Sequence, residues 1–174
     1  MDNDKGLVLI NTGKGKGKTT AALGQALRAS GQGMAVLIIQ FIKGRRSYGE
    51  LESLKKCGRI ELRPTGLGLI KDGEDLEPHR KAARQGWDMA QSEVAGGKWD
   101  MVVLDEIWVA VKRGFVAAEE VADLIKNKPP VLHLVLTGRH CPEAFYDLAD
   151  MVTLMQAVKH HMDAGVEAQR GMEF

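Results

Sequence analysis

The sequence predicts an α/β fold in which a mostly parallel sheet of about six strands lies between two layers of helices. Short apolar runs recur along the chain, and segments with helical periodicity separate most of them. The runs are almost continuously apolar, as expected for strands covered on both faces, and such strands belong to parallel sheets. Glycine-rich loops follow several of the runs. This fold class therefore also predicts a ligand site at the carboxyl ends of the strands.

The expected strands each follow a glycine, a proline or a charged residue, and valine, isoleucine and leucine dominate most of them. None approaches the roughly 20 apolar residues needed to span a bilayer. In chain order, the strands are expected at Leu7–Asn11, Met34–Phe41, Ile60–Pro64, Met101–Leu104, Val131–Leu136 and Met151–Leu154.

Three segments between the strands have the spacing of amphipathic helices. In the second of them, Ala83, Trp87, Ala90 and Val94 recur every three or four residues and so share one face. No repeat, low-complexity tract or linker divides the chain, and its 174 residues suit a single domain over residues 1–174. The helices are expected at Thr19–Ser30, Pro78–Val94 and Ala117–Asn127.

The composition argues against several partners. The formal net charge is +1 with 27% charged residues, so no strong field favours nucleic acid or a membrane surface. Cys57 and Cys141 lack CxxC spacing, which predicts reduced thiols that serve packing. The opening residues, MDNDKG, do not read as a signal peptide. We therefore expect a cytoplasmic protein with no nucleic-acid or membrane partner.

The segment after the first expected strand reads GKGKGKTT and predicts a phosphate-binding loop at a helix N-terminus. Glycines permit positive φ angles and bring backbone N–H groups close to an anion, which the helix dipole also favours. Lys18 is expected to reach the phosphates, and the Thr19 hydroxyl to ligate Mg²⁺. The alternative is a flexible surface turn. The expected nucleotide-binding residues here are Gly13, Lys14, Gly15, Lys16, Gly17, Lys18, Thr19 and Thr20.

A second motif, Met-Val-Val-Leu ending in Asp105 and Glu106, is typical of a Walker B strand. Together, the two motifs predict the P-loop NTPase-like, RecA-like form of the fold and a Mg²⁺ site, with Mn²⁺ as the alternative ion, at Thr19, Asp105 and Glu106. The acid pair alone would also suit a helix cap. Glu106 either activates water or ligates the metal. ATP is favoured over GTP because no guanine-reading tetrapeptide is present.

Three glycine-containing loops, at residues 13–17, 43–49 and 66–73, each follow an expected strand, so we expect them to share one cleft. No serine or cysteine lies in a recognisable nucleophile context. The nucleophile is therefore expected to belong to the second substrate.

From Leu7 to Phe174 the sequence resembles the ATP:corrinoid adenosyltransferases of the CobA/BtuR type. The resemblance rests on GKGKGKTTAALGQALRASGQG, VLIIQFIKG, WDMVVLDEI, VLHLVLTGRHCPE and LADMVTLMQAVKHHMDAGVEAQRGMEF. The phosphate loop is one residue shorter than the usual P-loop, with Thr12 at the expected first-glycine position, and this short form is the family's own.

The resemblance implies transfer of the 5′-deoxyadenosyl group of ATP to the Co(I) centre of a reduced corrinoid, with release of triphosphate. Loop N–H groups and lysines would hold the triphosphate, and Lys18, Glu106 and Arg139 are the catalytic candidates. The resemblance further implies an external cobalt reductase and is consistent with a homodimer. The remaining candidates for the nucleotide or corrinoid side are Gln40, Phe41, Lys43, Gly66, Gly68, Leu69, His160 and His161.

The corrinoid side departs from the family pattern, which has a GxGFTW-like segment whose aromatic residues press on the corrinoid. Leu69 and Lys71 stand where these aromatic residues are expected. Leu69 can offer an apolar wall, whereas a lysine in a dry pocket would bury a charge. Two alternatives therefore stay open: a P-loop ATPase or small-molecule kinase that has lost corrinoid adenosylation, and a non-enzymatic nucleotide-dependent binding module.

Overall fold

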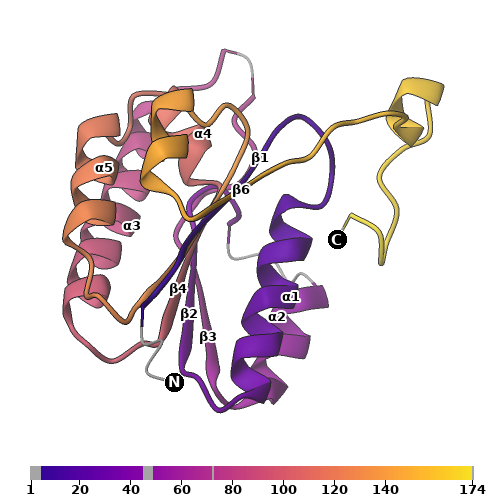
Figure 1. Cartoon of the computed structure of the whole chain (residues 1–174). Helices are drawn as coiled ribbons and strands as arrows, with labels where there is room; N and C mark the ends of the chain where they lie inside the picture. The colour runs from indigo at the N-terminus through magenta and orange to yellow at the C-terminus, as the bar shows by residue number, and fades with distance from the viewer. Residues whose placement is uncertain (1–4, 45–48, 72, 174) are drawn as a thin grey trace.

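The computed structural model describes residues 5–44, 49–71 and 73–173. Six strands form one sheet in the order β3-β2-β4-β5-β1-β6, and every neighbouring pair is parallel (Figure 1). The predicted fold class is confirmed, and the expected strands agree with the observed ones to within about two residues at each end. The strands are β1 Val8–Thr12, β2 Val36–Gln40, β3 Ile60–Pro64, β4 Met101–Asp105, β5 His133–Thr137 and β6 Met151–Leu154.

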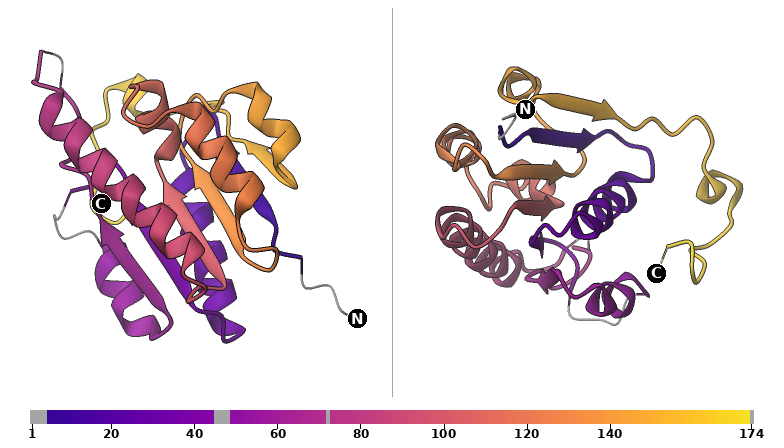
Figure 2. Two further views of the ribbon diagram at one scale, coloured as in Figure 1. Left: turned by 90° about the vertical axis from the view of Figure 1, so that its left-hand side faces the viewer. Right: turned by 60° about the horizontal axis from the view of Figure 1, so that its bottom comes forward.

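Helices cover both faces of the sheet, as predicted: α1 and α2 lie on one side, and α3, α4 and α5 lie on the other (Figures 1 and 2). The short helices α2 and α4 were not predicted, because six residues are too few to show a helical period. Within the described part of the chain, no helix is long and apolar enough to cross a membrane. The α-helices are α1 Lys18–Gly31, α2 Gly49–Leu54, α3 Glu77–Ala95, α4 Ile107–Lys112 and α5 Ala118–Asn127, and the 3-10 helices are η1 Lys55–Cys57, η2 Glu143–Leu148 and η3 His161–Ala164.

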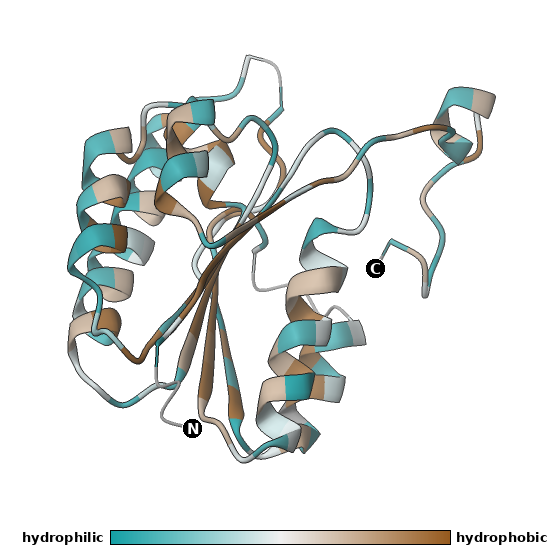
Figure 3. Cartoon of the chain, in the orientation of Figure 1, coloured by the Kyte–Doolittle hydropathy of each residue, from teal (hydrophilic) through white to brown (hydrophobic). Residues whose placement is uncertain are grey.

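The core consists of two layers because side chains of a strand alternate between the faces of the sheet. On β2, Leu37 and Ile39 pack in the cluster that contains Trp87 of α3, whereas Val36 and Ile38 pack against α1. The central strands are mostly apolar, whereas β3 alternates apolar residues with Glu61 and Arg63 (Figure 3). β2 and β4 are buried along their whole length, which explains their almost continuously apolar sequences, since neither face of these central strands is open to water.

The order of the strands in the sheet determines where the two sequence motifs lie. All six strands end at the same edge of the sheet, because all are parallel. The chain leaves β1 through α1 to reach β2, which lies on the far side of β4 and β5. The connection after β1 and the connection after β4 therefore start from strands on either side of β5. Open α/β sheets bind ligands outside the carboxyl ends of the strands at such a point. The loop after β1 and the acid pair after β4 therefore face each other across the end of one strand, β5.

We expect Leu134→Ala to lower the free energy of unfolding by about 2–5 kcal/mol, because this fully buried side chain on β5 would leave a cavity. Urea denaturation would measure the change. Leu27→Ala is the matched control: this leucine of α1 is 53% exposed, and its truncation should change stability by no more than about 0.5 kcal/mol. Equal losses in the two variants would contradict the two-layer core.

Candidate nucleotide site

The predicted phosphate loop joins the end of β1 to the start of α1 (Figure 1). Gly13 and Gly17 have φ angles of 103° and 115°, which favour glycine, and Gly17 directly precedes the first residue of α1. Gly15 is required for a different reason. A Cβ atom at this position would lie 2.7 Å from the carbonyl carbon of Gln156, so a larger residue would collide with the segment after β6.

One predicted phosphate donor of this loop is engaged elsewhere. The Gly15 N–H donates to the Met155 carbonyl oxygen at 2.8 Å, and the Met155 N–H donates to the Thr12 carbonyl oxygen at 2.8 Å. These bonds hold the chain after β6 against the loop. The Gly15 amide is thus used for structure here, although the resemblance implies that N–H groups of Gly13 to Gly17 hold the triphosphate.

Lys18 lies folded across the loop. Its Nζ atom donates to the carbonyl oxygens of Gly13 at 2.8 Å and Gly15 at 2.7 Å, and the residue is only 6% exposed. Burial lowers the pKa of Lys18, and the neighbouring positive charge of Arg139 adds to this effect, whereas Glu106 and Asp105 oppose it. The side chain therefore places a desolvated ammonium group against the loop, where an anion would be strongly attracted.

The Asp105 carboxylate is the centre of the hydrogen-bond network. Its Oδ1 atom accepts from the Thr19 hydroxyl at 2.8 Å and from the Thr137 hydroxyl at 2.7 Å. Its Oδ2 atom accepts from Gln40 Nε2 at 3.0 Å. The residue is 1% exposed. The structure therefore brings together two of the predicted metal-binding residues, Thr19 and Asp105, and places Gln40 behind the carboxylate instead of in a cavity.

Thr137 is a functional candidate that the sequence analysis missed. It is the last residue of β5, and besides donating to Asp105, its hydroxyl accepts the backbone N–H of Glu106 at 3.0 Å. One fully buried hydroxyl thus holds both members of the acid pair. A threonine at the end of an apolar strand carries no distinctive signal, and its role becomes visible only because β5 lies beside β4.

Glu106 stands in an unusual backbone conformation. Its φ angle of 63° is left-handed, which costs a non-glycine residue roughly 1–2 kcal/mol. It occupies the N-cap position of α4, as the helix-cap alternative requires, but its side chain makes no capping hydrogen bond. Burial and the adjacent Asp105 raise its pKa, and Lys18, Arg139 and Lys43 oppose the shift. These features are typical of a functional carboxylate.

A cavity of about 760 Å³ opens beside the loop and α1. Its walls include the catalytic candidates Lys18, Glu106 and Arg139, as well as Lys43, which forms an ion pair with Glu50 of α2. Arg139 is exposed and follows Gly138, where a Cβ atom would come within 2.9 Å of Trp108 Cβ. Residues of the C-terminal segment complete the walls: Ala157, His160, Met162, Asp163, Gly171, Met172 and Glu173.

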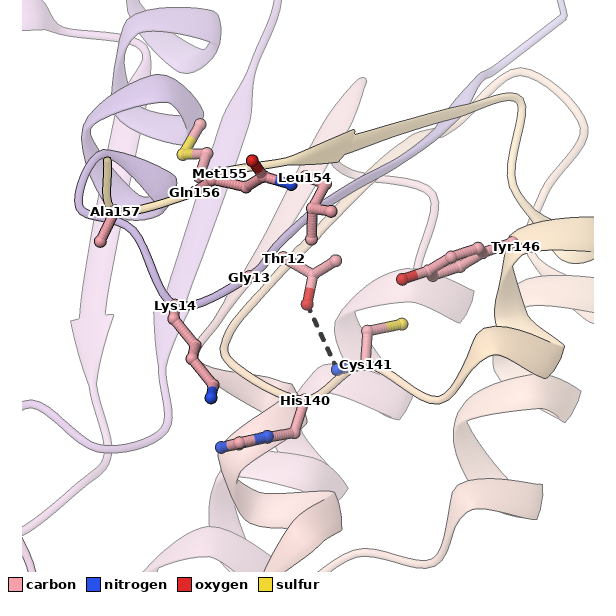
Figure 4. Close-up of a pocket in the computed structure, with 10 residues that line it drawn as sticks. All are labelled: Thr12, Gly13, Lys14, His140, Cys141, Tyr146, Leu154, Met155, Gln156 and Ala157. Carbon is pink, nitrogen blue, oxygen red and sulfur yellow. Dashed lines mark hydrogen bonds between the residues drawn. The ribbon is translucent and has the colours of Figure 1, made fainter. Parts of the chain in front are cut away.

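A second cavity, of about 520 Å³, lies beside the start of the same loop, and Lys14 and Ala157 line both cavities (Figure 4). It lies between the ends of β1, β5 and β6, and the sequence analysis did not predict it. Burial raises the pKa of the Cys141 thiol to about 12. The lining residues are Thr12, Gly13, Lys14, His140, Cys141, Tyr146, Leu154, Met155, Gln156 and Ala157.

The remaining candidates do not line either cavity. Phe41 is 2% exposed and packs in the core, which was the alternative considered for it. The loop that contains Gly66 and Gly68 lies against the end of β2 and the loop after it, with the Gly68 N–H donating to the Ile42 carbonyl at 2.8 Å. Leu69 is 86% exposed. Of the three loops expected to share one cleft, only those at residues 13–17 and 43–49 line the same cavity. Residues 45–48 and 72 of the expected loops lie outside the described residues.

The fold and the site define a P-loop nucleotide-binding protein: a parallel sheet, a glycine- and lysine-rich loop before a helix, and an acid pair two strands away. Among solved structures, the flagellar accessory protein FlaH from Methanocaldococcus jannaschii is similar, with a TM-score of 0.60 and 12% identity over 86% of this chain and 71% of that one. This likeness concerns the fold alone.

Sequence comparison identifies the family. The model of the ATP:corrinoid adenosyltransferases BtuR/CobO/CobP matches residues 4–174, so the chain belongs to this family. The chain is 38% identical to the corrinoid adenosyltransferase of Escherichia coli K12, over 99% of its length and 87% of the relative's. It is 37% identical to corrinoid adenosyltransferase CobA of Salmonella typhimurium, over 98% and 87% of the two lengths. The resemblance found in the sequence motifs is confirmed.

We expect Thr137→Val to lower the free energy of unfolding by about 1–3 kcal/mol, because Asp105 loses a donor and the Glu106 N–H loses its acceptor. Thr137→Ser keeps the hydroxyl and should retain most of this stability. Thr153→Val on β6 is the control for an exposed threonine and should change little. Urea denaturation of the three variants checks the prediction, and equal behaviour of the valine and serine variants at position 137 would contradict it.

The raised pKa of Glu106 predicts a pH-dependent stability. As the pH rises above the ordinary pKa of a glutamate, the unfolded chain ionises before Glu106 does, so the wild type loses stability up to the raised pKa. Glu106→Gln removes this loss. The variant should be more stable than the wild type at pH 8, with a difference that shrinks towards pH 4.5, as measured by denaturation in EDTA. A difference in stability between variant and wild type that stays constant across this pH range would contradict the raised pKa of Glu106. Glu167→Gln, at an exposed glutamate, is the control.

Proposed function

We propose that this protein transfers the 5′-deoxyadenosyl group of ATP to the Co(I) centre of a reduced corrinoid and releases inorganic triphosphate. The observation that carries this proposal is membership, over residues 4–174, of a family described by that activity. The chemistry of the cavities supports it. Among the residues described, Cys141 is the only cysteine against either cavity, and a thiol with a pKa of about 12 is not an activated nucleophile. The attack on C5′ is then left to the second substrate.

In this proposal, the protein stabilises the leaving group. A triphosphate that departs from C5′ gains negative charge, which preorganised cations stabilise at no reorganisation cost. Lys18 is held against the loop by the Gly13 and Gly15 carbonyls, and the exposed Arg139 lines the same cavity. Lys16 also lines it, and the N-terminus of α1 adds its dipole. The Lys18 ammonium group has three N–H donors and gives two of them to the loop carbonyls, so the third would serve a bound triphosphate.

The donor set suits a magnesium ion. A threonine hydroxyl and a carboxylate offer the hard oxygen ligands that Mg²⁺ prefers, and Thr19 Oγ1 and Asp105 Oδ1 already lie 2.8 Å apart. We infer that Thr19, Asp105 and Glu106 hold Mg²⁺, or Mn²⁺, directly or through water. When bound, the ion would supply charge neutralisation at the phosphates. Thr137 and Gln40 would fix the Asp105 carboxylate from behind.

The cavity beside Lys14 supports a place for the nucleoside. Its volume of about 520 Å³ lies in the range of small-molecule sites, and it offers the Tyr146 ring, the apolar Leu154 and the Gln156 amide for contact. It also adjoins the phosphate loop through Gly13 and Lys14. Figure 4 shows Lys14 and His140 at one side of this cavity and Tyr146 at the other.

The loop at residues 66–71 is the proposed corrinoid side. Leu67 and Leu69 are 57% and 86% exposed, so they offer apolar contact area close to the end of β2. Lys71 is also exposed, so its charge is not buried in a dry pocket before a corrinoid binds, and the protein bears no free-energy cost for burying it. The family resemblance supports four further parts of the proposal. They are a single domain over residues 1–174, an external cobalt reductase, a homodimer and a cytoplasmic location.

Product analysis tests the activity. With ATP, Mg²⁺ and chemically reduced cobalamin under anaerobic conditions, we expect a cobalt–carbon bond in the corrinoid spectrum and one triphosphate for each ATP consumed. The ATPase or kinase alternative gives ADP instead, with phosphate or a phosphorylated acceptor. Consumption of ATP without a cobalt–carbon bond would overturn the proposal.

Lys18→Ala should reduce the rate of adenosyl transfer by about 100-fold or more, the loss typical of removing one preorganised charge-stabilising donor. Single-turnover kinetics would measure this loss. Lys126→Ala, which removes an exposed lysine from α5, is the matched control and should leave the rate unchanged. An unchanged rate in the Lys18 variant would refute the role of the loop.

A further inference from the structure

The C-terminal segment brings two histidines against a glutamate beside the phosphate loop. His160 and His161 stack with their ring centroids 4.6 Å apart, at the start of η3, and Glu173 returns to them from the far end of the segment. One nitrogen of each histidine and one carboxylate oxygen of Glu173 all lie within 4.8 Å of one another. In the part of the chain that the structure describes, this is the group of histidine, cysteine and acidic residues spaced to hold a metal ion.

Two facing atoms of this group lack partners. His161 Nε2 and Glu173 Oε1 are shielded from solvent, and neither has a hydrogen-bond partner among the described residues. They lie 3.8 Å apart, which is too far for a hydrogen bond. Shielded polar atoms without partners are rare and costly, and a bound ion is one explanation. Ligand atoms lie about 3.4 Å apart across a tetrahedral ion with bonds of about 2.1 Å, close to the observed separation.

A metal ion can use the lone pair of His160 only at Nδ1. This nitrogen accepts the Met162 N–H at 3.3 Å, so in the neutral ring the proton lies on Nε2, and a metal ion on Nδ1 would replace this long contact. Glu173 Oε2 accepts a hydrogen bond from Lys16 Nζ at 2.8 Å, so the unpartnered Oε1 atom is the carboxylate oxygen that faces the histidines. Two imidazoles and one carboxylate are the ligands of borderline transition metals, whereas Mg²⁺ prefers oxygen ligands alone.

We propose that His160, His161 and Glu173 form a site for a divalent transition-metal ion of the Zn²⁺ or Ni²⁺ type, separate from the oxygen ligands at Thr19 and Asp105. An ion bound there would fasten both ends of the C-terminal segment together at the wall of the larger cavity.

Lys16 couples this site to the phosphate loop. Its Nζ atom lies 2.8 Å from Glu173 Oε2, so its ammonium group competes with a metal ion for the carboxylate. A polyphosphate that attracts Lys16 would release Glu173 for the metal. Removing the charge at position 16 should therefore strengthen metal binding in the absence of nucleotide.

Calorimetric titration of the full chain with Ni²⁺, without nucleotide, tests the site, and Ni²⁺ is chosen because imidazole ligands suit it and it is less selective for thiols. We expect one saturable site, roughly tenfold or more weaker in His161→Ala and in Glu173→Gln, and tighter in Lys16→Gln. Each variant removes a side chain that is partly exposed, so folding should be retained and is checked by the melting temperature.

The controls are His140→Ala, which removes an exposed histidine from the other cavity, and Glu167→Gln, which removes an exposed carboxylate of the same segment. Both should bind Ni²⁺ like the wild type. The proposal is overturned if the wild type shows no saturable binding, as it would if only water bridges the two unpartnered atoms. It is also overturned if the control variants lose as much affinity as the variants at positions 161 and 173.

Discussion

The buried carboxylate of Asp105 is the constraint on which the site depends. A carboxylate that is 1% exposed is tolerable only with hydrogen-bond donors around it, and here the donors come from Thr19, Thr137 and Gln40. These residues belong to α1, β5 and β2, and Asp105 itself ends β4. A single ionisable group therefore ties one helix and three strands together where the phosphate loop meets the sheet.

The same arrangement leaves charges at the cavity that are not neutralised locally. Lys18 is bonded only to carbonyl oxygens in the described structure, and burial and the charge of Asp105 disfavour an ionised Glu106. An anion in the loop and a cation near the acid pair would each relieve an unfavourable environment. The left-handed backbone at Glu106 adds a cost that the Thr137 hydroxyl helps to offset. The protein thus uses some of its folding free energy to prepare the site for a charged ligand.

The chain after β6 connects the two cavities and the loop. Met155 bonds to the loop at Gly15, and beyond it the segment reaches the wall of the larger cavity and pairs Glu173 with Lys16. Its residues from Ala157 onwards are mostly exposed, and the segment is held by polar contacts instead of core packing. Such contacts are weaker than burial and respond to bound charge, so this part of the wall is the one that a ligand can most easily alter.

The sequence by itself determined the fold class, the six strands and the phosphate loop. These features are encoded locally, by the period of apolar side chains and by contiguous glycines and lysines, and the family motifs are contiguous as well. Helices α2 and α4 are too short for that signal. Only the tertiary structure decided the role of Thr137, the burial of Phe41, the exposure of Leu69 and the pairing of Lys16 with Glu173. Each of these depends on which strands are neighbours in the sheet or on where a segment distant in the sequence packs. The local pattern of residues determines neither.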